Sequence, residues 1–179
     1  MATTPNTPSA GLQEAALLAP SRDLIELLKQ VESLRLKPYD DQTDREISAW
    51  VPGATVGYGH LISKAEWPTL KGGISAAHAK VLFERDLAPF VAGVRSRLQR
   101  AVLQQEFDAM VMLAFNIGSN AFAGSRVLGL INAGHTADSR ELEAAWKSWN
   151  RSQHKILQGL VRRRQCEWDI FTKGVYASW

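Results

Sequence analysis

The sequence predicts an α+β fold, in which a short antiparallel sheet is followed by a larger group of helices. Residues 36–60 contain β-branched and aromatic residues separated by Asp, Pro and Gly, a pattern typical of short strands and turns. Apolar residues recur at helical spacing before this segment, over residues 21–32, and again after residue 75. No pairs of parallel strands are indicated further along the chain, which excludes a doubly wound α/β fold.

The helices follow from local signals in chain order. Ser21 offers an N-cap, and the apolar residues after it predict a first helix that ends near Glu32. Asp138 with Glu141 resembles a capping box, although Asp replaces the usual Ser or Thr. Beyond the sheet, apolar spacing predicts helices over 79–91, 106–117, 125–132, 138–150 and 156–172.

Length and composition limit the class of protein. A chain of 179 residues fits one domain, or one core divided into two small lobes. Its 45% hydrophobic and 22% charged residues are typical of a globular protein and exclude a disordered one. The net charge of +3 is a mild excess that would favour an anionic partner but fits a plain solvated surface equally well.

The N-terminal segment and the cysteine content bear on compartment. Residues 1–20 are rich in Thr, Pro, Ser and Ala and predict a flexible tail. The longest apolar run there, 15–20, is too short for a signal peptide or a membrane span, so no export route is expected. Cys166 is the single cysteine, which agrees with a reducing compartment, and its place in an apolar helix predicts inert packing.

The segment from Glu32 to His60 carries the chemistry. Cleavage of a glycosidic bond needs one protonated carboxyl group for the leaving oxygen and one ionised carboxylate across the sugar. Glu32 can serve as the general acid, although a helix-end glutamate could also be simply solvated. Asp41, which counting from Glu32 through Tyr39 favours over its neighbour Asp40, can either position a water molecule or stabilise positive charge, and the Thr55 hydroxyl can help to orient that water.

The order of these residues resembles a known pattern. Glu32, then Tyr39-Asp40-Asp41, then Thr55 to His60 (TVGYGH) is similar to the E…D…T-x-G-x-G-H signature of the phage-type, T4-like lysozymes, the muramidases found as endolysins. The resemblance covers about residues 21–179 and continues in Ile74-Ser75, LFERDL (82–87), QQEFDAMVMLAFNIGSNAF (104–122), Ser125, Trp146 with Trp149, and GLVRRRQCEWDIF (159–171).

Two departures from the family pattern stand out. Ser33 follows Glu32 where the family usually has Gly, so a positive φ at this position would strain the backbone. The segment 42–54 is longer than in the shortest relatives and adds Trp50, Pro52 and Gly53, which should enlarge the hairpin rim of the cleft.

The resemblance implies a lysozyme-like fold with a small N-terminal lobe bearing a three-stranded antiparallel sheet, a larger helical C-terminal lobe, and a polysaccharide groove between them. Residues 21–179 would form this single catalytic domain. The implied activity is hydrolysis of the β-1,4 bond between N-acetylmuramic acid and N-acetylglucosamine in bacterial peptidoglycan. The alternatives are a lytic transglycosylase, which needs little from Asp41 and Thr55, and an inactive peptidoglycan-binding module, which predicts a damaged triad.

Two carboxylates and a water suffice for this reaction, so no cofactor and no metal are expected. The expected partner is peptidoglycan, with no nucleic acid, no stable membrane insertion and a monomeric enzyme. Such an enzyme would reside in the host cytoplasm before its release and act on peptidoglycan in the periplasm.

The resemblance also suggests substrate contacts. Asn116 suits an N-acetyl group or a sugar hydroxyl, Ser125 would assist, and Tyr58 would stack on a sugar face; the alternatives are a helix-end amide, a helix cap and lobe packing. His60 is expected to be structural, because no Cys or Ser nucleophile accompanies it.

The C-terminal third adds two further expectations. Trp146 and Trp149 lie three residues apart and should pack in the core. The family resemblance implies that one arginine of the run 162–164 turns toward the catalytic glutamate, and the sequence does not distinguish which.

Overall fold

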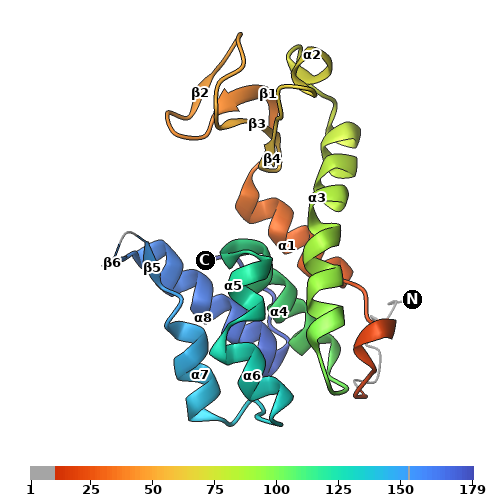
Figure 1. Cartoon of the computed structure of the whole chain (residues 1–179), viewed down its shortest axis with the longest axis vertical. Coiled ribbons are helices and arrows are strands. Elements are labelled where there is room, and N and C mark those ends of the chain that lie inside the picture. The colour runs from red at the N-terminus through yellow and green to blue at the C-terminus, as the bar shows by residue number, and fades with distance from the viewer. Residues whose placement is uncertain (1–10, 153) are drawn as a thin grey trace, which may run out of the picture.

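The computed structural model describes residues 11–152 and 154–179, and Figure 1 shows a small sheet-bearing lobe above a larger helical lobe. The N-terminal helices are η1 (Ala15–Leu17), α1 (Arg22–Glu32), α2 (Trp67–Leu70) and α3 (Ala76–Arg97). The remaining helices are α4 (Gln104–Ile117), α5 (Ser119–Ala123), α6 (Arg126–Asn132), α7 (Arg140–Lys147) and α8 (Gln158–Lys173). The strands are β1 (Arg35–Asp40), β2 (Arg45–Glu46), β3 (Ala54–Gly57), β4 (His60–Leu61), β5 (Arg151–Ser152) and β6 (Lys155–Ile156).

The sheet is antiparallel, as predicted, but it has four strands in the order β2-β1-β3-β4 rather than three. The extra strand arises because the two edge strands, β2 and β4, are two residues long and therefore too short to show alternation. In the register of the central pair, Tyr39 lies opposite Thr55 and Asp40 lies opposite Ala54. This pairing brings the end of β1 beside the start of β3.

The predicted helix starts are confirmed at Ser21 and corrected at Asp138. The Ser21 hydroxyl accepts from the Leu24 amide at the start of α1. For α7 the N-cap is Ser139, whose hydroxyl accepts from Leu142, so the predicted capping box at Asp138 is wrong. Asp138 instead accepts from the Thr136 hydroxyl in the preceding turn, and the Ser139 N-cap satisfies the amide of Leu142, one residue later than the predicted box would have done.

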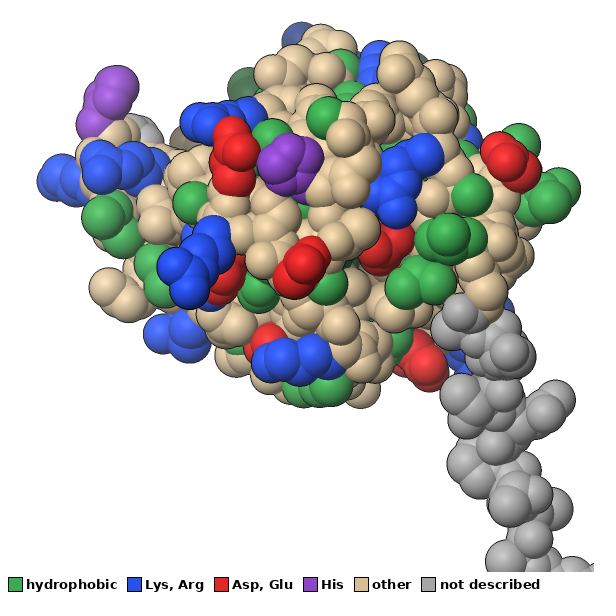
Figure 2. Space-filling view, turned by 90° about the horizontal axis from the view of Figure 1, so that it is seen from below, with side chains coloured by type: hydrophobic (Ala, Val, Ile, Leu, Met, Phe, Trp, Pro, Cys, Tyr) green, Lys and Arg blue, Asp and Glu red, His purple; other side chains and the backbone are tan. Residues whose placement is uncertain are grey.

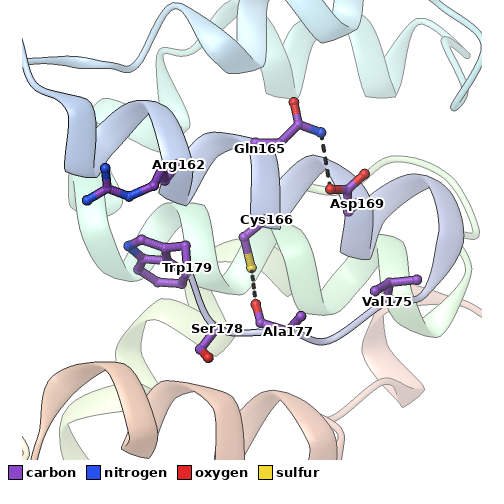
Figure 3. Close-up of a pocket in the computed structure, with 8 residues that line it drawn as sticks. All are labelled: Arg162, Gln165, Cys166, Asp169, Val175, Ala177, Ser178 and Trp179. Carbon is purple, nitrogen blue, oxygen red and sulfur yellow. Dashed lines mark hydrogen bonds between the residues drawn. The ribbon is translucent and has the colours of Figure 1, made fainter.

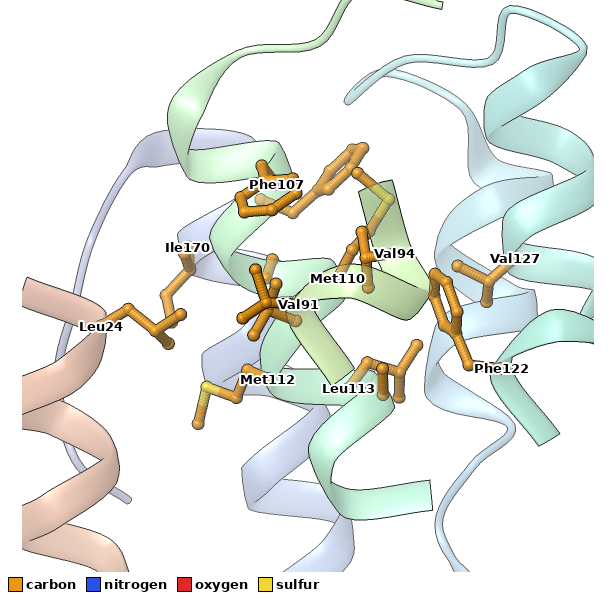
Figure 4. Packing of buried hydrophobic residues seen from close by; sticks show 14 of the residues in the cluster. Leu24, Val91, Val94, Phe107, Met110, Met112, Leu113, Phe122, Val127 and Ile170 are labelled. Carbon is orange, nitrogen blue, oxygen red and sulfur yellow. The ribbon is translucent and has the colours of Figure 1, made fainter. Parts of the chain in front are cut away.

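Two separate hydrophobic cores account for the two lobes. The smaller core underlies the sheet and consists of Ala54, Val56, Ile62, Leu70 and Leu82. The larger core surrounds α4, whose middle turns are almost entirely buried, and Figure 4 shows residues from several helices converging on it. Helix α3 contributes to both, because Leu82 belongs to the smaller core and the next residue, Phe83, belongs to the larger. In Figure 1, α3 extends from one lobe to the other.

The mild positive charge is not concentrated at the helical end of the molecule. Figure 2 views that end from below and shows acidic and basic side chains interspersed. This mixture fits a solvated surface, one of the two readings of the +3 net charge. Among the described residues, no helix is both long enough and apolar enough to span a bilayer.

The second half of the predicted tail packs on the core instead of remaining flexible, and residues 1–10 lie outside the described part of the chain. Gln13 pairs with Val102 through two backbone hydrogen bonds of 2.9 Å. Leu18 is 1% exposed, and its carbonyl accepts from Arg95 Nε at 2.7 Å. The prediction failed here because one buried leucine in the short segment 11–20 produces no periodic signal.

Leu18→Ala should lower the free energy of unfolding by about 2–5 kcal/mol, the usual cost of truncating a buried leucine. Leu17→Ala is the matched control, because the neighbouring leucine is 77% exposed and its loss should leave urea denaturation almost unchanged. Equal midpoints for the two variants would show that this segment does not dock in solution.

Candidate active site

Glu32 is the last residue of α1, as the sequence predicted, and its side chain is 26% exposed. The turn between β3 and β4 covers it on one side, because a Cβ atom at Gly59 would lie 3.8 Å from Glu32 Oε2. On another side, Arg163 Nη1 of α8 approaches Glu32 Oε1 at 3.6 Å. The carboxyl group is therefore held between the sheet and the helical lobe while part of its surface stays accessible.

Ser33, directly after Glu32, has a positive φ, the condition under which backbone strain is expected at this position. Its φ is 55° with ψ 135°, a combination that residues with a Cβ atom rarely adopt. Glycine would adopt it without that penalty. The reversal of the chain between α1 and β1 thus aims Glu32 at the expense of local backbone strain.

Arg163 is the arginine of the 162–164 run that reaches the proposed acid. Its guanidinium lies between two carboxylates, Glu32 at 3.6 Å and Glu167 at 3.3 Å. The ring of Trp179 lies 5.2 Å from the same guanidinium carbon, in cation–π geometry. These contacts restrict the long Arg163 side chain to the position from which it reaches Glu32.

Glu167 is fully buried and was not identified from the sequence. One of its oxygens accepts from Arg164 Nη2 at 2.7 Å, and the other accepts from Trp146 Nε1 at 2.9 Å. Complete burial raises the pKa of the Glu167 carboxyl, while the Arg164 and Arg163 guanidinium groups act in the opposite direction. The signal that could have found it is a single Glu placed three and four residues after two arginines on one helix face.

Asn116 lies in the last turn of α4 and is linked to Glu167 through Arg164. Its Oδ1 accepts from Arg164 Nη2 at 2.7 Å, which leaves the amide NH₂ free to donate to a bound molecule. Burial lowers the pKa of Arg164, and Glu167 opposes that shift. A continuous series of polar contacts therefore joins Glu32 to Asn116 through the two arginines and Glu167.

Asp41 and Thr55 are brought together by a shared acceptor. The Asp41 amide donates to the Gly53 carbonyl at 3.1 Å, and Thr55 Oγ1 donates to the same oxygen at 2.9 Å. Thr55 is 4% exposed, whereas the Asp41 side chain faces solvent. The sheet register thus places the two predicted groups beside one another at the end of β1.

Asp40, the rival of Asp41, has a local structural contact set. Its carboxylate accepts from the Gln42 amide at 3.0 Å and from the Thr43 hydroxyl at 2.9 Å, which closes the turn between β1 and β2. The pKa of neighbouring Tyr39 is raised. Burial is the main cause, the positive charge of Arg35 opposes the rise, and the negative charges of Asp44, Asp41 and Glu32 add to it.

Tyr58 and Ser125 occupy positions with a clear structural role. Tyr58 lies in the turn between β3 and β4 and packs edge-on against Phe83, with ring centroids 5.6 Å apart. Ser125 is 8% exposed and caps α6, where its hydroxyl accepts from Leu128. His60 is 6% exposed and bonds to Asp86 at 2.7 Å, which confirms the structural role expected for it.

Cys166 and Trp146 also occupy the packing positions predicted for them. Figure 3 shows the Cys166 thiol pointing to the Ala177 carbonyl in a shallow pocket between α8 and the C-terminal segment. Burial raises the pKa of this thiol to about 11, so it is not a nucleophile near neutral pH. Trp146 is fully buried, whereas Trp149 lies beyond the end of α7 and is partly buried.

Comparison with known proteins agrees with this arrangement. Residues 29–167 match the family model described as phage lysozyme. The chain belongs to the phage lysozyme family. A solved endolysin from Escherichia coli O157:H7 phage FAHEc1 superposes with a TM-score of 0.75 and 29% identity over 90% of this chain and 98% of that one.

Two curated relatives, both endolysins, differ in how much of their own length this chain spans. It is 36% identical to an endolysin of Bacillus phage PZA over 84% of this chain, but it spans only 54% of that relative's length. It is 31% identical to an endolysin of Salmonella phage P22, over 76% of this chain and 89% of the relative. The lysozyme-like fold is therefore confirmed, with the number of strands corrected.

No group of three or more His, Cys, Asp or Glu side chains suited to a metal ion occurs among residues 11–152 and 154–179. The side chains gathered around Glu32 and Asp41 offer carboxylate, hydroxyl, amide and guanidinium groups, which can transfer a proton, hold a water molecule and bind sugar polar groups.

Ser33→Gly should stabilise the protein by about 1 kcal/mol, because removal of the Cβ relieves strain of roughly 1–3 kcal/mol against the entropy that glycine loses on folding. Ser33→Ala is the control, since alanine keeps the Cβ and therefore the strain. Thermal unfolding followed by circular dichroism distinguishes them: a higher midpoint for the alanine variant than for the glycine variant would contradict the strain argument.

Glu167→Gln should destabilise the protein by about 3–5 kcal/mol, because it leaves two buried arginines without their shared counter-charge. Glu141→Gln is the matched control, since Glu141 pairs with Arg126 on an exposed surface and its loss should leave the urea midpoint unchanged. Equal midpoints for the two variants would show that the buried pair does not support the fold.

Proposed function

We propose that this chain is an endolysin-type muramidase that hydrolyses the β-1,4 bond between N-acetylmuramic acid and N-acetylglucosamine in bacterial peptidoglycan. The observation that carries the proposal is the pairing of Asp41 with Thr55 at one carbonyl, at the edge of the lobe whose turn also covers Glu32. This provides an acid and a water-holding pair from separate elements, as glycoside hydrolysis requires.

Glu32 is proposed as the general acid, which donates its proton to the glycosidic oxygen as the bond breaks. Arg163, at 3.6 Å, limits the orientations that the carboxyl group can adopt. Asp41 is proposed to act as a carboxylate, either by positioning the attacking water or by stabilising positive charge on the sugar ring. Thr55 would assist Asp41 with the water, and no cofactor enters the reaction.

Substrate contacts are proposed for Asn116, Tyr58 and Ser125. The amide NH₂ of Asn116 can donate to an N-acetyl carbonyl or a sugar hydroxyl, because its oxygen already accepts from Arg164. Tyr58 is partly exposed beside the turn over Glu32 and can present its ring edge or its hydroxyl. Ser125 uses its hydroxyl to cap α6, so its contribution to binding would be through the placement of that helix.

We further propose that the enzyme acts as a monomer on peptidoglycan in the periplasm after release from the host cytoplasm. Residues 21–179 would form the catalytic domain, with the docked segment 11–20 belonging to the same folded unit. The proposed partner is the glycan strand itself, without nucleic acid and without stable insertion into a membrane.

Mass spectrometry of fragments released from purified peptidoglycan tests the proposed reaction. A muramidase yields reducing muramic ends, whereas a transglycosylase yields anhydro-muramic ends and would replace this proposal. Glu32→Gln keeps the shape of the side chain but has no transferable proton, so release of fragments should fall by roughly a hundred- to ten-thousand-fold. An unchanged circular dichroism spectrum serves as the control for folding.

Asp41→Asn should remove most activity on isolated walls, because the negative charge beside the proposed water is lost. Asp40→Asn is the matched control, since this neighbouring carboxylate accepts hydrogen bonds from the turn between β1 and β2, and much activity should remain. Initial rates of turbidity clearing give the comparison. The reverse order of the two rates would move the catalytic role to Asp40.

A further inference from the structure

Gly53 stands directly against the carboxylate of Asp41. A Cβ atom built on Gly53 would lie 2.2 Å from Asp41 Oδ1 and 3.1 Å from Asp41 Cγ. Real Cβ atoms do not approach other atoms this closely, because van der Waals contact between carbon and oxygen begins well beyond 3 Å. The Asp41 carboxylate therefore occupies the space that any side chain other than hydrogen would need.

The backbone of Gly53 acts on the same two groups through its carbonyl. That oxygen accepts from the Asp41 amide at 3.1 Å and from Thr55 Oγ1 at 2.9 Å. A carbonyl oxygen has two lone pairs, so both donors can be satisfied at once. One residue thus fixes the main chain of Asp41, the space for its side chain and the rotor of the Thr55 hydroxyl.

The direction of the Thr55 hydrogen bond has a chemical consequence. Because Thr55 donates its only proton to Gly53, its oxygen can serve a water molecule only as an acceptor. A water that donates one hydrogen to Thr55 and the other to the Asp41 carboxylate keeps its own lone pair free. This lone pair is the one that must attack the anomeric carbon if the reaction proceeds through a positioned water.

We propose that Gly53 is a positioning residue of the reaction: its carbonyl orients Asp41 and the Thr55 hydroxyl, and its missing side chain leaves the space that the Asp41 carboxylate fills. This inference rests on the proposed glycoside hydrolysis. Gly53 belongs to the segment 42–54, whose added residues therefore do more than enlarge the hairpin rim. Its effect on the reaction is exerted through its contacts with Asp41 and Thr55.

The chain offers a matched control for the backbone conformation of Gly53. Gly53 has a φ of +93° and Gly134 a φ of +95°, so alanine imposes similar strain at both positions. A Cβ atom at Gly134, in the turn after α6, would meet no atom within 4 Å. The difference between Gly53→Ala and Gly134→Ala therefore isolates the contact with Asp41 from the cost of a positive φ.

Steady-state hydrolysis of a soluble peptidoglycan fragment provides the test. Gly53→Ala should lower kcat by about a hundred-fold, the usual effect of moving a catalytic group by about 1 Å, with little change in KM. Gly134→Ala should keep the wild-type kcat while showing a similar loss of Tm. A kcat for Gly53→Ala close to that of Gly134→Ala would overturn this proposal alone, whereas a wild-type protein that releases no fragments would overturn the proposed function as well.

A double-mutant cycle separates positioning from general damage to the fold. If Gly53 acts through Asp41, Gly53→Ala should cause little further loss of kcat in an Asp41→Asn background, because the group that it positions is already disabled. If the loss is again about a hundred-fold in that background, the two effects are independent and the positioning role is excluded. Because the Asp41→Asn variant and the double variant should both be slow, their residual rates are measured at high enzyme concentration.

Discussion

The site depends on one buried negative charge, the carboxylate of Glu167. It holds Arg163 and Arg164 of the same helix together with the indole of Trp146. Each arginine then extends to a different residue of the proposed active site, Glu32 or Asn116. Without the Glu167 counter-charge, the two adjacent arginine cations would repel one another. The orientation of Glu32 and Asn116 at the surface therefore depends on a carboxylate inside the helical lobe.

Features that depend on neighbouring residues could be predicted from the sequence. Features that depend on contacts between distant segments could not. Ser21 and the end of α1 at Glu32 follow from capping and apolar spacing, which are local signals. The choice of Arg163 over its neighbours depends on the rotation of α8 against α1, which no local pattern encodes. The prediction of a flexible segment around Leu18 failed for the same reason, because the burial of Leu18 depends on contact with helices far along the chain.

Asp41 and Thr55 are held in place by different interactions from those that orient Glu32 and Asn116. Asp41 and Thr55 are positioned by the main chain, through strand register and a shared carbonyl, rather than by ion pairs. The sequence motif identified Asp41 and Thr55. The role proposed for Gly53 could not be predicted in this way, because it depends on where a Cβ atom at that position would lie relative to Asp41. Hydrogen bonds to the backbone are little affected by salt, whereas the arginine contacts to Glu32 are electrostatic and only partly shielded from solvent.

Helix α3 has a consequence for how the whole molecule loses its structure. Leu82 and Phe83 are consecutive, yet they belong to different hydrophobic cores. Unfolding of either core would remove packing contacts from α3, and the other core depends on the same helix. Loss of structure in one lobe should therefore destabilise the other lobe. The two lobes should consequently melt as a single cooperative unit, with one transition seen by every probe, despite their separate interiors.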